Sequence, residues 1–496
     1  MLQSENSNEK LRIIEEKSNK SLKWTTLGEI LSKLILPITN IILARLLAPE
    51  IFGIVAGISA VVYLAEIFSD AGFSKYIVQN KESEDKIPLI SSIAFWVNII
   101  VSVILFVLIA SFNESIAKLI GNEGYGLHLL ISAIQIPLYA MSSVYVSMLQ
   151  RQFEFKKLFF VRLINVISSL ILYVLFASLN FGVWTLIIAP LIAAVIQFIV
   201  LIVATRWVPK WKFNFSHMMQ MFSISVFSFL EAILAWVASS LLIIFLSNTF
   251  TKDVVGSFKM AKTTENSIFT IFSAIFIPIL LTTLSKLQND KNEFDKQYFR
   301  FQELAALIVI PAIAGVMIYS EEITQIMLGN DFGINAVIVI RYYTISTGLV
   351  LLLRSFPTTY FLAIGKPIYS VITQIIFLVV YIPVAFLTIK HSNYDIFVYA
   401  TTATTSILII VTYIFLVAKF KVSLKKTFLI LLKPLLPTAI MAGIGIGLKF
   451  LITSFLGGKV WISIIAMVIC VLIYFLLLFL FNRKQFKAFI KIAMRK

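Results

Sequence analysis

Long apolar stretches separated by short polar segments run through almost the whole chain. A helix needs about 20 residues to cross a bilayer, and fourteen stretches approach or exceed that length. They lie at residues 24–47, 51–70, 88–110, 126–149, 158–179, 183–205, 218–247, 254–285, 303–328, 334–362, 367–389, 394–418, 428–452 and 460–481. The segments between them are too short for a folded domain of about 50 residues. The pattern predicts an all-α integral membrane protein with about fourteen transmembrane helices.

Composition excludes a soluble fold and several kinds of chemistry. Hydrophobic residues make up 59% of the 496 residues, against roughly 45–50% in soluble domains. The single cysteine, Cys470, cannot form a disulfide within the chain, and the three histidines match no metal-ligand spacing. No Gly-Lys pair continues into the Ser or Thr of a phosphate-binding loop. We therefore expect no metal, no cofactor and no enzymatic activity.

The distribution of basic residues orients the predicted spans. Cytoplasmic loops of membrane proteins retain Lys and Arg, and an intracellular N-terminus places 29 of the 42 Lys and Arg residues on the inner side and five outside. Both termini are therefore predicted to be cytoplasmic. This asymmetry also explains the net charge of +17 without nucleic-acid binding.

A short sequence echo indicates two related halves. Glu50–Gly53 and Asp253–Gly256 share an acidic residue, two apolar residues and a glycine at the predicted start of a span, 203 residues apart. An offset of six spans gives both halves the same orientation, as in transporters with parallel repeats. We therefore expect two pseudo-symmetric lobes of six helices. The predicted parts are a cytoplasmic segment 1–23, an N-lobe 24–206, a cytoplasmic linker 207–217, a C-lobe 218–419, two further helices within 428–481 and a basic tail 482–496.

Polar residues form a stripe on the eighth predicted span. They recur at helical spacing, so they share one face of the helix: Lys259, Lys262, Thr263, Asn266, Thr270 and Ser273. Charged groups in a bilayer are costly and normally face the interior of a helix bundle, so this stripe is expected to line a wet cavity. Lys259 lies near the predicted outer surface, and the alternative for it is to extend to the lipid headgroups.

Other ionisable residues within the spans suggest an anionic cargo. Lys33, Arg341 and Arg354 are further candidates for substrate contact, although Glu29 and Lys33 have the spacing of an ion pair that merely joins helices. Eight of the cations within the predicted spans, Lys33, Arg45, Arg162, Lys259, Lys262, Arg341, Arg354 and Lys433, are weighed against four of the carboxylates. This surplus favours an anion such as a phosphate. The four carboxylates are Glu29, Glu66, Glu231 and Glu265, of which the first three are candidates for proton or sodium coupling.

Several motifs along the chain resemble those of a known family. They are Leu43–Gly53 with Ser69–Phe73, Leu149–Phe155, Phe181–Leu186, Leu284–Gln288, and Pro311 with Gly315 and Leu328–Gly329. In this order they resemble polysaccharide flippases of the MATE-like MOP superfamily, of the Wzx and teichuronic-acid exporter type. The resemblance covers most of the chain.

The resemblance implies a transport function. Such flippases move undecaprenyl-pyrophosphate-linked oligosaccharide repeat units from the inner to the outer leaflet of the bacterial cytoplasmic membrane. They work by alternating access and without ATP, alongside the machinery that polymerises surface polysaccharide. The family's cationic cavity fits Lys33, Lys259 and Lys262 by kind of residue. The alternatives are a drug or metabolite antiporter of the same superfamily, or a membrane glycosyltransferase or polymerase.

Overall fold

The computed structural model describes residues 35, 37–70, 72–79, 86–211, 215–391, 393–455 and 460–481. Every regular element in these residues is a helix, and thirteen helical segments are long and apolar enough to cross a membrane. The predicted all-helical membrane fold is confirmed. The predicted first span lies mostly outside the described residues, where the short helix Pro37–Leu46 covers its end. The count of fourteen spans therefore stays a prediction.

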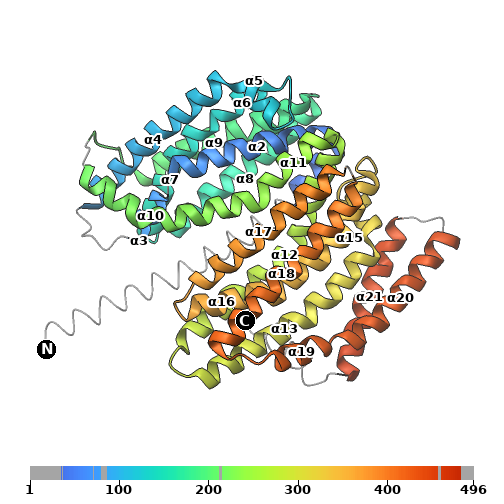
Figure 1. The fold of residues 1–496 in the computed structure, drawn as a ribbon. Helices are drawn as coiled ribbons and strands as arrows, with labels where there is room; N and C mark the ends of the chain where they lie inside the picture. Colours follow the sequence, from blue (N-terminus) through green and yellow to red (C-terminus); the bar gives the residue numbers. More distant parts are fainter. Residues whose placement is uncertain are drawn as a thin grey trace. The chain divides into compact units, whose positions relative to one another are not determined.

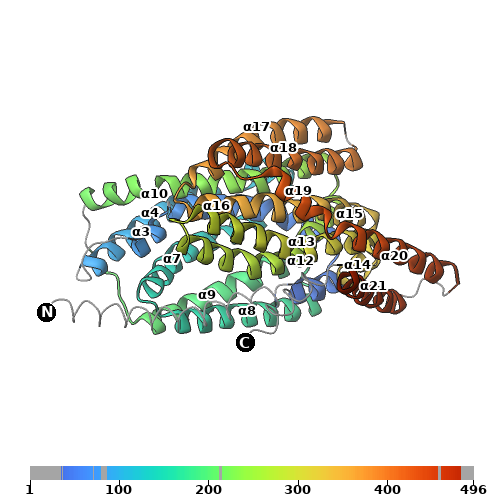
Figure 2. The same cartoon turned by 90° about the horizontal axis from the view of Figure 1, so that it is seen from below.

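The chain divides by packing into two compact units, Met1–Gly256 (unit 1) and Ser257–Lys496 (unit 2). The two views of the fold show α8 and α9 running side by side in unit 1 (Figures 1 and 2). The helices of unit 1 are α2 (Pro49–Asp70), α3 (Phe73–Gln79), α4 (Ile87–Ser111), α5 (Asn113–Leu119), α6 (Gly126–Ala133), α7 (Gln135–Arg151), α8 (Phe155–Ser178), η2 (Gly182–Trp184), α9 (Thr185–Thr205), α10 (Phe215–Trp236), the π-helical turn η3 (Val237–Leu241) and α11 (Leu242–Thr249).

Unit 2 contains the rest of the helices. It begins within α12 (Lys252–Lys286), and its neighbouring pairs α17 with α18 and α20 with α21 are clear in both views (Figures 1 and 2). Its other helices are α13 (Lys291–Ile318), α14 (Ser320–Met327), α15 (Gly333–Val350), the π-helical turn η4 (Leu351–Ser355), α16 (Phe356–Ala363), α17 (Ile368–Lys390), α18 (Tyr394–Phe420), α19 (Leu424–Leu432), α20 (Leu435–Phe455) and α21 (Val460–Phe481).

The two copies of the sequence echo contact each other. A Cβ atom added at Gly53 would lie 2.0 Å from the carbonyl oxygen of Lys252, and one added at Gly256 would lie 1.8 Å from that of Pro49. Pro49 and Lys252 each stand one residue before the echoed motif, so the contact is reciprocal. Only glycine permits so close an approach between helix starts. The echo thus has a packing role that its sequence alone does not reveal.

Helix starts in unit 2 follow ordinary capping chemistry. The Asp290 side chain accepts hydrogen bonds from the backbone N–H groups of Asn292 and Glu293, both at 3.1 Å, at the start of α13. Asn393 caps α18 in the same way through the N–H of Ile396. Such caps satisfy N–H groups that have no partner within the helix.

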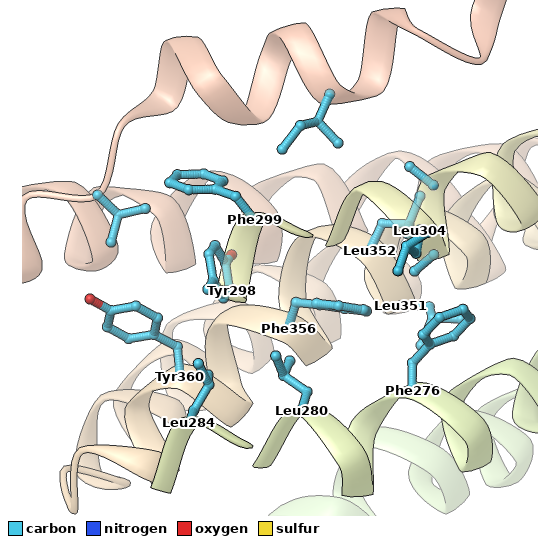
Figure 3. Close-up of a cluster of buried hydrophobic side chains, with 14 of the residues drawn as sticks. Phe276, Leu280, Leu284, Tyr298, Phe299, Leu304, Leu351, Leu352, Phe356 and Tyr360 are labelled. Atoms are coloured by element: carbon cyan, nitrogen blue, oxygen red, sulfur yellow. The ribbon is translucent and has the colours of Figure 1, made fainter. Parts of the chain in front are cut away.

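The core of unit 2 holds the C-terminal half of α12 in place. Figure 3 shows Phe276, Leu280 and Leu284 of α12 turned toward Phe356 and Tyr360 of α16. All five side chains are buried. Because apolar interiors are close-packed, this cluster fixes the position of the helix that carries the polar stripe.

Two helices from the second half of the predicted spans pack within unit 1. Helices α10 and α11 contact α2, and α10 also contacts α3, so both pack within unit 1. The sequence analysis assigned residues 218–247 to the C-lobe. The predicted domain boundaries, with the linker at 207–217, stay a prediction.

Candidate functional site

The two lysines of α12 stand one helical turn apart in the part of the chain that belongs to unit 2. Lys259 is exposed and Lys262 is half-buried. The ammonium nitrogen of Lys262 lies 5.1 Å from the ring centre of Tyr343 and 5.7 Å from that of Phe258. Aromatic faces attract cations at such distances. These rings hold the Lys262 side chain in place without neutralising its charge.

Neither ammonium group has an ion-pair or hydrogen-bond partner among the described residues. Two other cations within predicted spans do have ion-pair partners. Arg341 lies 2.8 Å from the Glu321 carboxylate, and Lys433 lies 2.7 Å from that of Glu303. The charges of Lys259 and Lys262 are therefore available to an anion.

The remaining polar residues of the stripe extend this surface. Asn266 is exposed, and its side-chain amide has no hydrogen-bond partner in the described part of the chain. Thr263 is half-buried, and its hydroxyl donates to the carbonyl of Lys259 at 2.8 Å. Thr263 therefore keeps its lone pairs as acceptors, while Asn266 offers both donors and an acceptor.

A buried carboxylate lies three residues after Lys262. Glu265 has no exposed surface, and one of its oxygens accepts a hydrogen bond from the Thr347 hydroxyl at 3.1 Å. Its other oxygen has no partner among the described residues. From the sequence, Glu265 is a carboxylate within a predicted span but is not among the predicted site residues. Its spacing from Lys262 was the available signal, whereas its contact with α15 appears only in the structure.

The two predicted arginines lie in different surroundings. Arg341 donates to Ser320 at 2.9 Å and pairs with Glu321, which also pairs with Lys449 at 3.0 Å. The hydrogen bond from Lys449, supported by Arg341, lowers the pKa of Glu321. Arg354 lies in η4 and donates to the Gln374 side chain at 2.6 Å. The structure does not place either arginine in contact with Lys262, and their role in substrate binding stays a prediction.

The predicted coupling residues are only partly described. Lys33 and Glu29 lie outside the described residues, and so does the side chain of Glu231 on α10. Glu66 on α2 is 8% exposed, and one of its carboxylate oxygens has no partner in the described ranges. A buried carboxylate of this kind can exchange a proton or bind a cation, so Glu66 keeps its predicted role as a proposal.

An apolar groove lies between α13, α20 and α21 in unit 2. Its volume is about 310 Å³, and Pro311, Gly315, Met441, Met467 and Phe475 are among the residues that line it. Its wall is almost wholly hydrocarbon, sulfur and aromatic ring. Such a surface can hold an apolar chain but offers little to a charged group.

The family of this chain follows from its similarity to known families. A family model described as polysaccharide biosynthesis protein matches residues 42–335, more than half of the chain. The chain belongs to this family. The predicted relation to proteins of polysaccharide assembly is thereby confirmed.

Curated relatives of this family member have names that refer to the biosynthesis of succinoglycan and of lipopolysaccharide. The chain is 22% identical over 296 residues to the succinoglycan biosynthesis transport protein ExoT of Rhizobium meliloti, covering 60% of this chain and 59% of ExoT. It is 18% identical over 361 residues to the lipopolysaccharide biosynthesis protein WzxC of Escherichia coli, covering 72% of this chain and 70% of WzxC. The matches thus span about six to seven tenths of the relatives' length.

Solved structures share the fold of this polysaccharide biosynthesis protein. The lipid II flippase MurJ in an inward closed conformation matches with a TM-score of 0.77 and 16% identity, over 93% of this chain and 99% of MurJ. An inward-facing MATE multidrug transporter matches with a TM-score of 0.63 and 13% identity, over 79% of this chain and 96% of the transporter. At these identities the likeness establishes the fold. The protein is a multi-pass membrane protein with a MurJ- and MATE-like fold.

Proposed function

We propose that this protein is a flippase that moves undecaprenyl-pyrophosphate-linked oligosaccharide repeat units from the inner to the outer leaflet of the bacterial cytoplasmic membrane. It works by alternating access in the assembly of surface polysaccharide, with both termini in the cytoplasm and alongside a polysaccharide polymerase. It catalyses no covalent step. The observation that carries this proposal is the pair of ammonium groups at Lys259 and Lys262, which form no ion pair and no hydrogen bond with a described residue.

The energetics explain why this observation carries the proposal. A lysine within a span is costly, with an upper value of about 2.5–3.5 kcal/mol at the span centre on insertion scales. Lysines kept within a span without an ion-pair partner need a functional reason, and a pyrophosphate supplies one because it forms charge-assisted hydrogen bonds with them. The family membership and the names of the relatives support a polysaccharide intermediate as the molecule that carries the phosphate.

The apolar groove complements the lysines. The proposed substrate joins an anionic headgroup to a long hydrocarbon chain, so its binding needs both a cationic surface and an apolar one. Unit 2 provides the lysines on α12 and the groove beside α20 and α21. A drug antiporter for cationic molecules is disfavoured, because unpaired lysines repel such cargo.

The test removes one ammonium group at a time. Purified protein in liposomes is supplied with a fluorescent undecaprenyl-pyrophosphate-linked N-acetylglucosamine, and flipping is followed by quenching from outside. Lys262→Ala should slow flipping at least about tenfold, since one charge-assisted hydrogen bond is worth roughly 1.5–3 kcal/mol. Lys262→Arg keeps the charge and should retain most of the rate.

The matched control is Lys366→Ala. Lys366 is exposed and has no side-chain partner among the described residues, and it lies in the turn before α17. Its removal changes the net charge as Lys262→Ala does, yet flipping should stay at the wild-type rate. Equal rates for Lys262→Ala and the wild-type protein would contradict the proposal.

A further inference from the structure

Unit 1 contains a polar cavity that is lined by none of the predicted site residues that the structure describes. Its volume is about 390 Å³, within the range of small-molecule sites. Side chains from α7, α8 and α9 form most of its wall, including the amides of Gln135, Gln150, Asn165 and Gln197. No residue that lines it in the described part of the chain carries a formal charge.

The four amide groups have unused hydrogen-bonding capacity. None of them has a side-chain hydrogen bond to a described residue. Each amide offers two donor hydrogens and an acceptor oxygen. Polar groups within the membrane must find partners, because the hydrocarbon supplies none. The cavity therefore holds water or a polar ligand rather than a lipid chain.

Three of the five serines that line the cavity present acceptors. The hydroxyl of Ser143 is within reach of Asp70 at 3.3 Å and of the Ala140 carbonyl at 3.0 Å, and its single proton points to one of these protein oxygens. Ser74 also donates to Asp70, and Ser147 donates to the Ser143 carbonyl at 2.9 Å. Because these protons are engaged inside the protein, the lone pairs of the three hydroxyl oxygens are left for a ligand.

This mixture of groups selects one class of ligand. An anion needs donors and positive charge, whereas this cavity presents acceptor oxygens with the Asp70 carboxylate behind them. The hydroxyls of a sugar each donate and accept, which matches amides interleaved with serines. Tyr139 also lines the cavity and is 44% exposed, so its ring is available to the C–H face of a sugar.

We propose that this cavity binds the sugar part of the lipid-linked substrate, as an uncharged saccharide. The proposal rests on the flippase function and assigns the saccharide to unit 1. Phosphate contacts at Lys259 and Lys262 are chemically separate from it. A variant can therefore lose affinity for the sugar and keep affinity for the phosphate. Another variant can lose affinity for the phosphate and keep affinity for the sugar.

The test compares bare undecaprenyl pyrophosphate with the same lipid carrying one glucose, galactose or N-acetylglucosamine. Binding to the full-length protein in lipid nanodiscs is measured by native mass spectrometry. The wild-type protein should bind at least one glycosylated lipid about tenfold more tightly than the bare lipid, as expected for a few added hydrogen bonds. Asn165→Leu combined with Gln197→Met keeps the side-chain volume and should abolish this preference while affinity for the bare lipid stays unchanged.

Two further variants keep the test decisive. Gln150→Met removes an amide from a third helix and should reduce the preference severalfold, even if the double variant fails to fold. Asn335→Leu removes an amide from α15, outside the cavity, and should leave the preference intact.

The possible failures are distinguishable. Absence of bare-lipid binding by the wild-type protein would overturn the flippase function. Equal wild-type affinities for the bare lipid and all three glycosylated lipids would overturn the sugar site alone. A preference that survives in both cavity variants would also overturn it. Lys262→Ala should weaken binding of all the lipids by the same factor and so preserve the preference.

Discussion

At the scale of single residues, the sequence predicted which charged side chains share a helix face better than it predicted their ion-pair partners. Lys259, Lys262 and Asn266 fall on one helix as their spacing indicates, because a helix fixes neighbours on its own face. Which cations are neutralised depends on residues far along the chain. Lys433, for example, pairs with Glu303, 130 residues away. The four amides of unit 1 were also missed, since isolated glutamines and asparagines on three helices form no pattern until the helices pack.

The carboxylate of Glu265 should weaken the attraction of Lys262 for an anion. A negative charge one turn away partly cancels the field of the ammonium group. We therefore expect Glu265→Gln to tighten the binding of bare undecaprenyl pyrophosphate about fivefold at pH 8, with slower release and slower flipping. The variant keeps the hydrogen bond that Thr347 donates. Native mass spectrometry gives the affinity, and the liposome assay gives the rate.

A second carboxylate serves as the control for this prediction. Glu303 is already paired with Lys433 at 2.7 Å, and both belong to unit 2. Glu303→Gln changes the net charge by the same amount and should leave lipid affinity unaltered. If both variants tighten binding equally, the effect comes from the overall charge and not from the position of Glu265.

At the scale of helices, span positions were predicted closely and interruptions were not. The predicted spans 51–70, 88–110 and 367–389 differ from α2, α4 and α17 by at most two residues at either end, because hydropathy alone sets these limits. The predicted span 218–247 is interrupted by the π-helical turn η3. A π-helical turn has one residue more in each hydrogen-bonded turn than an α-helix. It does not change the hydropathy of the segment, so the apolar pattern of the sequence does not reveal it.

The reciprocal glycine contact makes a prediction about stability. Gly53→Ala places a methyl group 2.0 Å from the Lys252 carbonyl oxygen, and backbone atoms must move to accept it. Overpacking of this kind costs about 1–3 kcal/mol. We expect a lower apparent Tm in detergent, measured by intrinsic fluorescence. Gly256→Ala should behave in the same way, because it meets the Pro49 carbonyl.

The control for the glycine prediction lies on α20. A methyl group added at Gly447 meets no atom within 4 Å. Gly447→Ala should therefore raise the Tm slightly, since alanine favours a helix by about 0.5–1 kcal/mol over glycine. An unchanged Tm in both Gly53→Ala and Gly256→Ala would show that the two helix starts do not need this close approach.

At the scale of the whole molecule, fold and family were predictable, while the packing of individual spans against one another was not. Fourteen apolar stretches and several short motifs were enough to predict a MATE-like flippase fold, because both signals are local in sequence. The packing of α10 and α11 with α2 in unit 1 depends instead on contacts between distant segments. Hydropathy contains no information on which spans pack together.

The proposed orientation makes the membrane potential a source of energy for transport. With the cytoplasm negative, a dianionic pyrophosphate that crosses the whole field outward gains about 4.6 kcal/mol per 100 mV. Protein charges that move with the substrate, such as Lys259 and Lys262, would reduce this gain. We expect flipping in liposomes to accelerate when a potassium gradient with valinomycin makes the cytoplasmic side negative, and to slow when the gradient is reversed.

An imposed pH gradient at zero potential tests the competing scheme, in which Glu66 or Glu231 exchanges protons. Flipping that ignores the potential and follows only the pH gradient would replace potential-driven transport with proton coupling. Repeating the measurement with Glu66→Gln would then show whether Glu66 is the proton-exchanging group.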